Sequence, residues 1–147
     1  MNRNLILNWL RNDDPAELAT LWHWADEVRR RHVGDAVLLR ALVEMGNVCR
    51  RRCAYCGLWA GAEVGRYRMT AEEILACARA GREGGCGTVV LQSGEDGDLD
   101  PEWLAGLIRS IKADPHTADV AVTLSVGEWG DDALALWRRA GADRYLL

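Results

Sequence analysis

Residues 36–147 repeat one pattern, in which a short apolar run leads into a polar loop and then into a stretch with helical periodicity. The apolar runs are rich in valine and leucine and show no polar alternation, which is typical of strands buried on both faces. Such strands, separated by helices, form parallel sheets through right-handed crossovers. We therefore expect an α/β fold with a parallel sheet, whose strands cover 36–45, 87–92, 120–126 and 143–147.

Capping residues mark the helices between these strands. Thr70 and Glu73 have the spacing of a capping box, and this helix is expected to stop at Gly81. The Asp-Pro pair at 100–101 supplies an N-cap and a residue suited to the first helical position. A third helix is expected over 131–141, from acidic residues to a glycine stop.

The N-terminal segment, residues 1–35, is expected to be a helical extension that precedes the sheet. Asp14 is a suitable N-cap, Pro15 a suitable first residue and Gly34 a suitable end. Most of the seven tryptophans occupy apolar helical positions and are expected in the core. The apolar positions that predict an amphipathic helix here are Leu18, Leu21, Trp22, Ala25 and Val28.

The number of strands is half of that in a closed eight-stranded (β/α) barrel, which typically needs about 250 residues. The last strand would also end at Leu147 with no helix behind it, which leaves an uncovered sheet edge. We therefore expect residues 36–147 to be the first half of a TIM-type (β/α) barrel, truncated from a longer chain. A complete but open partial barrel is the alternative.

Composition limits the classes of function. Acidic residues outnumber basic residues by 22 to 18 and the net charge is -4, so no broad basic surface for nucleic acid is expected. No apolar run is long enough to span a membrane, and the N-terminal apolar run is too short for a secretion signal. We expect a cytoplasmic protein whose five cysteines stay reduced, which favours metal binding over disulfides.

Three of the cysteines, Cys49, Cys53 and Cys56, share one loop with C-x3-C-x2-C spacing. The loop follows the first expected strand, at the sheet edge where parallel folds bind ligands. Structural zinc sites and iron–sulfur clusters normally take four protein ligands, so three thiolates leave one coordination position for another molecule. The histidines lie away from this edge in the expected fold. Cys77 and Cys86 are expected to be small buried apolar residues.

The segment from Cys49 to Cys56 resembles the C-x3-C-x-aromatic-C loop of the radical S-adenosylmethionine (SAM) superfamily, with Tyr55 as the aromatic residue. The resemblance implies that Cys49, Cys53 and Cys56 hold a 4Fe-4S cluster, whose remaining iron binds the amino and carboxylate groups of SAM. It also implies reductive cleavage of SAM to methionine and a 5'-deoxyadenosyl radical, which abstracts hydrogen from a small-molecule substrate. The electron would come from a reduced donor such as a flavodoxin or ferredoxin.

Two further polar clusters follow the second and third expected strands. Residues 93–95, Ser-Gly-Glu, resemble the Gly-Gly-Glu motif of the superfamily, which implies that Glu95 and the nearby backbone hold the amino group of SAM. A turn carboxylate is the alternative role for Glu95. Ser125 and Glu128 are expected to line the cofactor or substrate cavity, or else to cap the next helix. Tyr55 is implied to lie against the adenine. The expected cofactor-binding residues are Tyr55, Gln92, Ser93, Gly94, Glu95, Ser125 and Glu128.

Longer segments narrow the resemblance. RYRMTAEEI at 66–74, QSGED at 92–96 and SVGEW at 125–129 look like the radical SAM maturases of FeFe-hydrogenase. Biotin synthase and the methylornithine synthase of pyrrolysine biosynthesis are similar enough to remain alternatives. A non-catalytic zinc-binding module and a simple iron–sulfur electron carrier are alternatives of other classes. The arginines at 50–52 either offset the negative charge of a cluster or are solvated loop charges.

Overall fold

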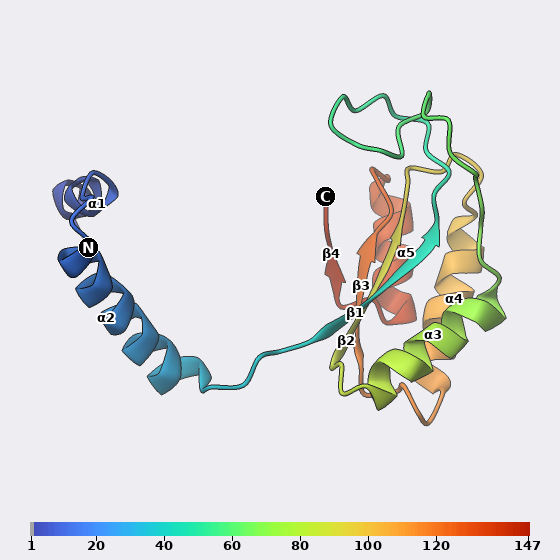
Figure 1. Ribbon diagram of the computed structural model, residues 1–147. Helices are drawn as coiled ribbons and strands as arrows, with labels where there is room; N and C mark the ends of the chain where they lie inside the picture. Colours follow the sequence, from blue (N-terminus) through green and yellow to red (C-terminus); the bar gives the residue numbers. More distant parts are fainter. Residues whose placement is uncertain (1) are drawn as a thin grey trace. The chain divides into compact units, whose positions relative to one another are not determined.

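The structure, a computed structural model, describes residues 2–147 (Figure 1). The chain separates into two compact units, Met1–Val37 and Leu38–Leu147. The first unit contains α1 (Arg3–Leu10) and α2 (Pro15–Val33). The second contains four strands and three helices, and it carries every residue expected to bind a cofactor. Over residues 2–147 no helix combines the length and the apolar character needed to cross a bilayer.

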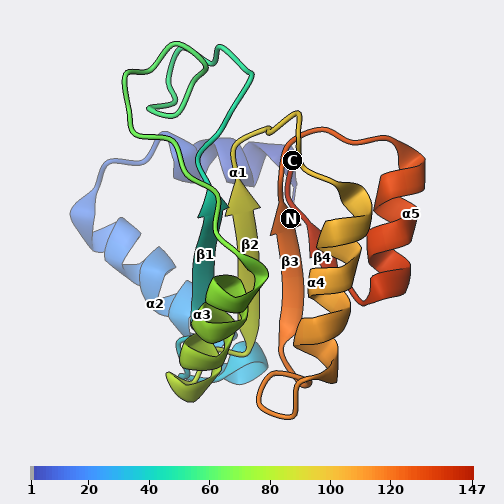
Figure 2. The ribbon, with the colours of Figure 1, turned by 90° about the vertical axis from the view of Figure 1, so that its right-hand side faces the viewer.

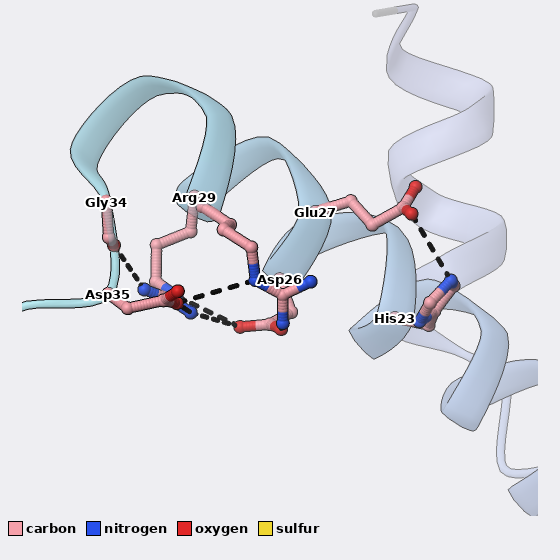
Figure 3. Close-up of polar contacts among 7 residues, drawn as sticks. His23, Asp26, Glu27, Arg29, Gly34 and Asp35 are labelled. Atoms are coloured by element: carbon pink, nitrogen blue, oxygen red, sulfur yellow. Dashed lines mark hydrogen bonds and ion pairs between the residues drawn. The ribbon is translucent and has the colours of Figure 1, made fainter.

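Helix α2 confirms the expected N-terminal helix. The carboxylate of Asp14 accepts hydrogen bonds from two backbone N–H groups of the first turn, and Pro15 is the first helical residue. At the other end, Arg29 donates to Asp26 at 2.8 Å and to Asp35, beyond the helix, at 2.9 Å (Figure 3). These contacts tie the last turn of α2 to the residues that follow it.

The apolar side chains of the N-terminal unit do not form a core. No residue of α1 or α2 is buried, and Trp22 is 64% exposed. Trp9 and Trp24 meet only edge to face. All seven tryptophans lie in the described residues, and among them only Trp137 is buried. The expectation that most tryptophans are core residues is therefore wrong. Helical periodicity predicts a helix correctly, but it does not say what covers the apolar face.

The second unit is a four-stranded parallel sheet, as expected, and its strand order is β1-β2-β3-β4. Its three helices lie together on one face of the sheet (Figure 2). Each helix follows a strand and leads to the next, so successive strands run in the same direction. The elements are β1 (Arg40–Gly46), α3 (Ala71–Glu83), β2 (Thr88–Ser93), α4 (Pro101–Ala113), β3 (Ala121–Ser125), α5 (Asp131–Ala140) and β4 (Arg144–Tyr145).

The core lies between the sheet and these helices. In the strand register Val43 lies beside Leu91, which lies beside Leu124, and all three are buried. They belong to one cluster with Ile74 of α3. Leu42, one position along β1, points to the opposite face and is 62% exposed. The expectation of a strand buried on both faces is therefore wrong for β1.

β1 and β4 are shorter than expected, because a segment forms a strand only where a neighbouring strand offers it hydrogen bonds. β1 begins at Arg40 and not at residue 36, because the neighbouring strand begins at Thr88, the residue paired with Arg40. Val37 is exposed in the segment before β1. β4 has two residues, Arg144–Tyr145, and not the five expected, and in the described sheet it pairs with β3 alone. Apolar composition alone therefore overestimates the length of both strands.

Helix α3 also differs from its expected length. The capping box of Thr70 and Glu73 is present, but the helix continues past Gly81 to Glu83. Gly81 faces β1 so closely that a Cβ there would lie 2.4 Å from the Cβ of Ala41. Gly81 therefore lies where α3 packs on β1 and leaves no room for a side chain. It does not end the helix.

Candidate functional site

The loops expected to bind ligands all leave the sheet at the edge where the strands end (Figures 1 and 2). The segment between β1 and α3, residues 47–70, contains the three cysteines and is called the cysteine loop below. The β2–α4 loop covers 94–100 and the β3–α5 loop covers 126–130. Because the strands are parallel, segments far apart in the sequence meet at this edge.

Two residues hold the base of the cysteine loop. The buried side chain of Asn47 accepts a hydrogen bond from the Tyr67 N–H at 2.8 Å and donates to the Gly65 carbonyl at 2.7 Å. The Arg66 guanidinium donates to several carbonyls of the loop, including that of Trp59 at 2.8 Å. Sequence reasoning gave neither Asn47 nor Arg66 a role, because nothing local to them indicates these partners.

The three thiols of the cysteine loop are free and half-buried. Cys53 and Cys56 lie on one tight turn, in which the Cys56 N–H donates to the Cys53 carbonyl at 3.2 Å. Tyr55, between them, is 94% exposed. Within residues 2–147, no three His, Cys, Asp or Glu side chains are grouped so that they would hold a metal ion. The ligand role of Cys49, Cys53 and Cys56 and the adenine contact of Tyr55 therefore stay predictions.

The donor set fits a 4Fe-4S cluster in its chemistry. Such clusters are held by cysteine thiolates, and the loop offers three thiols that form no disulfide. Residues 47–67 contain no helix or strand, so no regular element prevents the sulfurs from converging on a cluster. The other two cysteines differ from expectation in part. Cys86 is half-buried, but Cys77 is exposed on α3, so its assignment as a buried apolar residue is wrong.

Glu95 lies buried against the cysteine loop, with 7% of its surface exposed. Arg50 Nε donates to Oε1 of Glu95 at 2.9 Å, and Arg51 Nε donates to Oε2 at 2.7 Å. The backbone N–H of Glu128 reaches the same Oε2 at 3.4 Å. Burial alone raises the pKa of Glu95, but the hydrogen bonds from Arg51, Arg50 and Glu128 outweigh it and hold this pKa below its ordinary value. Glu95 is therefore an ionised carboxylate at neutral pH.

Two glycines make room for these contacts. A Cβ on Gly94 would lie 2.3 Å from the Val48 carbonyl oxygen and 2.7 Å from the Cβ of Cys49. The bare backbone of the β2–α4 loop thus packs directly on the cysteine loop. Gly127 has φ +87°, and a Cβ there would lie 2.6 Å from Cγ of Glu95. The sequence alone assigns Gly127 no role of its own, although its place in the SVGEW segment is a signal for one.

Glu128 joins the same charged group. Arg51 Nη2 contacts Glu128 Oε2 at 2.6 Å while its Nε holds Glu95, so one guanidinium bridges two loops. These contacts raise the pKa of Arg51, chiefly through its hydrogen bond to Glu95. The N-cap of α5 is Gly130, with no side-chain hydrogen bond, so Glu128 does not cap that helix. The structure therefore places Glu95 and Glu128 in one group, in which Arg51 lies between the two carboxylates and contacts both.

The remaining expected residues lie close to this group. Gln92 and Ser125 are neighbours in the strand register, at the ends of β2 and β3. Ser93 Oγ donates to the Gly94 carbonyl at 2.8 Å. Ser125, like Glu128, does not cap α5. Their contacts with a cofactor stay predictions.

An ion pair outside the expected site links the cysteine loop to the β2–α4 loop a second time. Arg68 donates to buried Asp96 through Nε at 2.5 Å and Nη2 at 2.9 Å. The hydrogen bond from Arg68 lowers the pKa of Asp96 and outweighs its burial. Both residues line a cavity of about 560 Å³ between the first turns of α3 and α4, together with Met45 and Ser93. Arg68 and Asp96 lie in the RYRMTAEEI and QSGED segments, but no local pattern in the sequence indicates that they pair.

Known proteins resemble this chain along most of its length. The family model described as the radical SAM superfamily matches residues 43–147. The chain is 44% identical over 146 residues to the FeFe-hydrogenase maturase subunit HydE of Thermotoga maritima, covering 99% of this chain and 41% of that protein. It is 32% identical over 151 residues to the biotin synthase of Cutibacterium acnes, again covering 99% of this chain and 41% of that protein.

The fold has a counterpart among solved structures. The crystal structure of methylornithine synthase (PylB) matches with a TM-score of 0.86 and 25% identity, over 98% of this chain and 42% of that one. The chain thus spans about two fifths of the length of these relatives. The expected partial (β/α) barrel is confirmed. The cysteine loop, the fold and the matched family model together show that this chain belongs to the radical SAM superfamily.

Proposed function

We propose that this chain provides the cluster- and SAM-binding part of a radical SAM enzyme that acts in maturation of the FeFe-hydrogenase active site. Members of the superfamily use a 4Fe-4S cluster and SAM. When bound, this pair would supply the electron that breaks a carbon–sulfur bond of SAM, giving methionine and a 5'-deoxyadenosyl radical. The observation that carries the proposal is the three-thiol loop, set in a sequence 44% identical to HydE over 146 residues.

Each residue of the site has a proposed task. Cys49, Cys53 and Cys56 would hold three irons as thiolates, which leaves one iron for the amino and carboxylate groups of SAM. Glu95 is an anion at neutral pH, and such a carboxylate accepts strong hydrogen bonds from an ammonium group. Tyr55 would lie against the adenine. Gln92, Ser93, Gly94, Ser125 and Glu128 would complete the walls around SAM and the substrate.

The reaction partners follow from the class of enzyme. The substrate would be a small molecule, and the electron would come from a reduced flavodoxin or ferredoxin in the cytoplasm. A biotin synthase or a methylornithine synthase remains the second assignment, because relatives of both kinds match the same part of the chain.

Anaerobic reconstitution with iron and sulfide tests the cluster. We expect a brown protein with about four irons and four sulfides per chain. Cys49→Ala, Cys53→Ala and Cys56→Ala should each lose the chromophore, whereas Cys77→Ala, at the exposed cysteine of α3, should keep it. Retained colour in all three loop variants would reject the assignment.

Two measurements separate this function from the other classes. A zinc-binding module would contain one zinc and no sulfide by metal analysis. A simple electron carrier would form a cluster whose electron paramagnetic resonance spectrum does not change when SAM is added. Hydrogenase maturation is tested in a host that lacks its own HydE: the gene containing this segment should restore hydrogenase activity. Restoration of biotin synthesis in a biotin auxotroph instead would favour the second assignment.

A further inference from the structure

The three consecutive arginines of the cysteine loop behave differently. Arg50 and Arg51 both hold the carboxylate of Glu95, which lies 45 and 44 positions further along the chain. The side chain of Arg52 makes no hydrogen bond or ion pair with any residue between 2 and 147. We call Arg50 and Arg51 the arginine clamp. The clamp is therefore a specific arrangement and not a general feature of the basic triplet.

The clamp attaches the cysteine-bearing part of the loop to the rest of the fold. Asn47 and Arg66 hold the base of the loop, but their side chains form no hydrogen bond with residues 53–56, the turn that carries Cys53 and Cys56. The backbone N–H of Arg50 adds a third link to the β2–α4 loop, since it donates to the Glu95 carbonyl at 3.0 Å. No helix or strand stiffens this part of the loop.

The clamp and the Glu128 backbone together occupy the hydrogen-bond acceptor positions of the Glu95 carboxylate. An ionised carboxylate offers about four acceptor positions on its two oxygens. Oε1 of Glu95 contacts Arg50 through Nε at 2.9 Å and Nη2 at 2.8 Å. Oε2 contacts Arg51 Nε at 2.7 Å and the Glu128 N–H at 3.4 Å. An ammonium group that arrives at Glu95 must therefore replace a present donor.

We propose that the arginine clamp fastens the cysteine loop to Glu95, and that an incoming ammonium group displaces Arg51 from that carboxylate. Arg51 is the donor that leaves, because its Nη2 already contacts Glu128 at 2.6 Å and keeps that partner. Arg50 stays and keeps the loop attached. The identity of the ammonium compound, SAM, rests on the proposed function, whereas the fastening of the loop does not.

Thiol alkylation of the protein without cluster tests the fastening. The rates for Cys49, Cys53 and Cys56 are measured by peptide mass spectrometry and divided by the rate for exposed Cys77, which lies on α3 and serves as the internal standard. In the double variant Arg50→Gln/Arg51→Gln we expect the relative rates to rise about fivefold, as expected for loss of a small network of partly exposed ion pairs. Arg52→Gln is the matched control, because it removes a charge beside Cys53 but no contact with Glu95, and it should therefore not raise these rates.

The direction of the change in alkylation rate distinguishes attachment of the loop by the clamp from a purely electrostatic effect of the arginines on the thiols. Removing positive charge near a thiol disfavours the reactive thiolate, so charge loss alone would slow alkylation. A faster reaction in the double variant, with no acceleration in Arg52→Gln, supports the clamp. Equal or slower reaction in the double variant overturns it. Arg51→Lys keeps the charge but loses the two-sided contact and should be intermediate, and circular dichroism of each variant checks that the fold is kept.

The exchange at Glu95 is tested with reconstituted protein and SAM itself. If Arg51 competes with the ammonium group, Arg51→Gln should bind SAM about threefold or more tightly. Its binding should also weaken more with added salt, because an ion pair forms at Glu95 without another being broken. Equal or weaker binding by Arg51→Gln, when the wild type binds SAM, would overturn the exchange and leave the proposed function intact. Absence of SAM binding in the wild type would overturn the proposed function and the exchange together, while the alkylation result would still decide the fastening.

Discussion

Gly127 offers the sharpest test of how the site is built. It has φ +87°, a conformation that L side chains rarely adopt, and it lies directly against Glu95. In Gly127→Ala the new Cβ would lie 2.6 Å from Cγ and 2.8 Å from Cβ of Glu95. Both distances are shorter than real Cβ contacts, so the β3–α5 loop or Glu95 must move.

The cost has two parts. A non-glycine residue in a sparsely populated backbone region costs about 1–3 kcal/mol. Overlap with a packed neighbour typically adds about 1–3 kcal/mol, of which part is relieved by movement of Glu95. We expect the free energy of unfolding to fall by about 2–4 kcal/mol. At about 4 °C per kcal/mol for a chain of this size, Tm should fall by about 8–16 °C.

Thermal and urea unfolding of the whole chain would measure this loss. Gly87→Ala is the matched control, because a Cβ there meets no atom within 4 Å and φ is not positive. It should be neutral or slightly stabilising. Glu95→Gly/Gly127→Ala removes the overlap and keeps the backbone strain, so the double-mutant cycle should show a coupling of about 1–3 kcal/mol. A Gly127→Ala variant as stable as Gly87→Ala would refute the reasoning.

Other predictions concern pH and packing. Because the pKa of Glu95 is lowered below 4.5, its ionised form stabilises the fold at neutral pH, and this contribution is lost as the pH falls below about 4.5. Acid unfolding curves of Glu95→Gln should therefore be flatter in that range, and a curve parallel to the wild type would contradict this. Burial, and then the charge of Glu95, raise the pKa of Tyr145 to about 12, so stability should fall between pH 10 and 12 as the tyrosine of the unfolded chain ionises first. Tyr145→Phe should remove this fall, as followed by circular dichroism, and one tyrosine should disappear from the late phase of a spectrophotometric titration. Gly81→Ala should lower Tm, since its Cβ would lie 2.4 Å from that of Ala41, and Ala41→Gly should restore part of the loss. If Ala41→Gly does not restore any stability in the Gly81→Ala background, the two residues are not in the contact described.

The parts of the site that were predicted are those encoded by local spacing. Cys49, Cys53 and Cys56 occupy one short segment, so three thiols on one loop follow from the order of residues alone. The capping box of Thr70 and Glu73 is equally local, and the structure contains it. The resemblance to a family identified Glu95 as a site residue, but it did not identify the groups that hydrogen-bond to Glu95.

The partners of Glu95 were not predicted because they depend on the path of three separate loops. Arg50 and Arg51 belong to a basic triplet in which Arg52 looks equivalent, and only the fold distinguishes them. The need for glycine at position 127 arises from a side chain 32 positions earlier, so no local pattern reveals it.

The sequence by itself determined the order of strands and helices, the parallel sheet and the loop with three thiols, because hydrophobic periodicity, caps and short spacings act over a few residues. Only the tertiary structure decided where strands begin, which tryptophans are buried and which arginines hold Glu95. A strand ends where its partner ends, and a side chain is buried only where another element covers it. Those outcomes depend on the register and packing of segments that are distant in the chain.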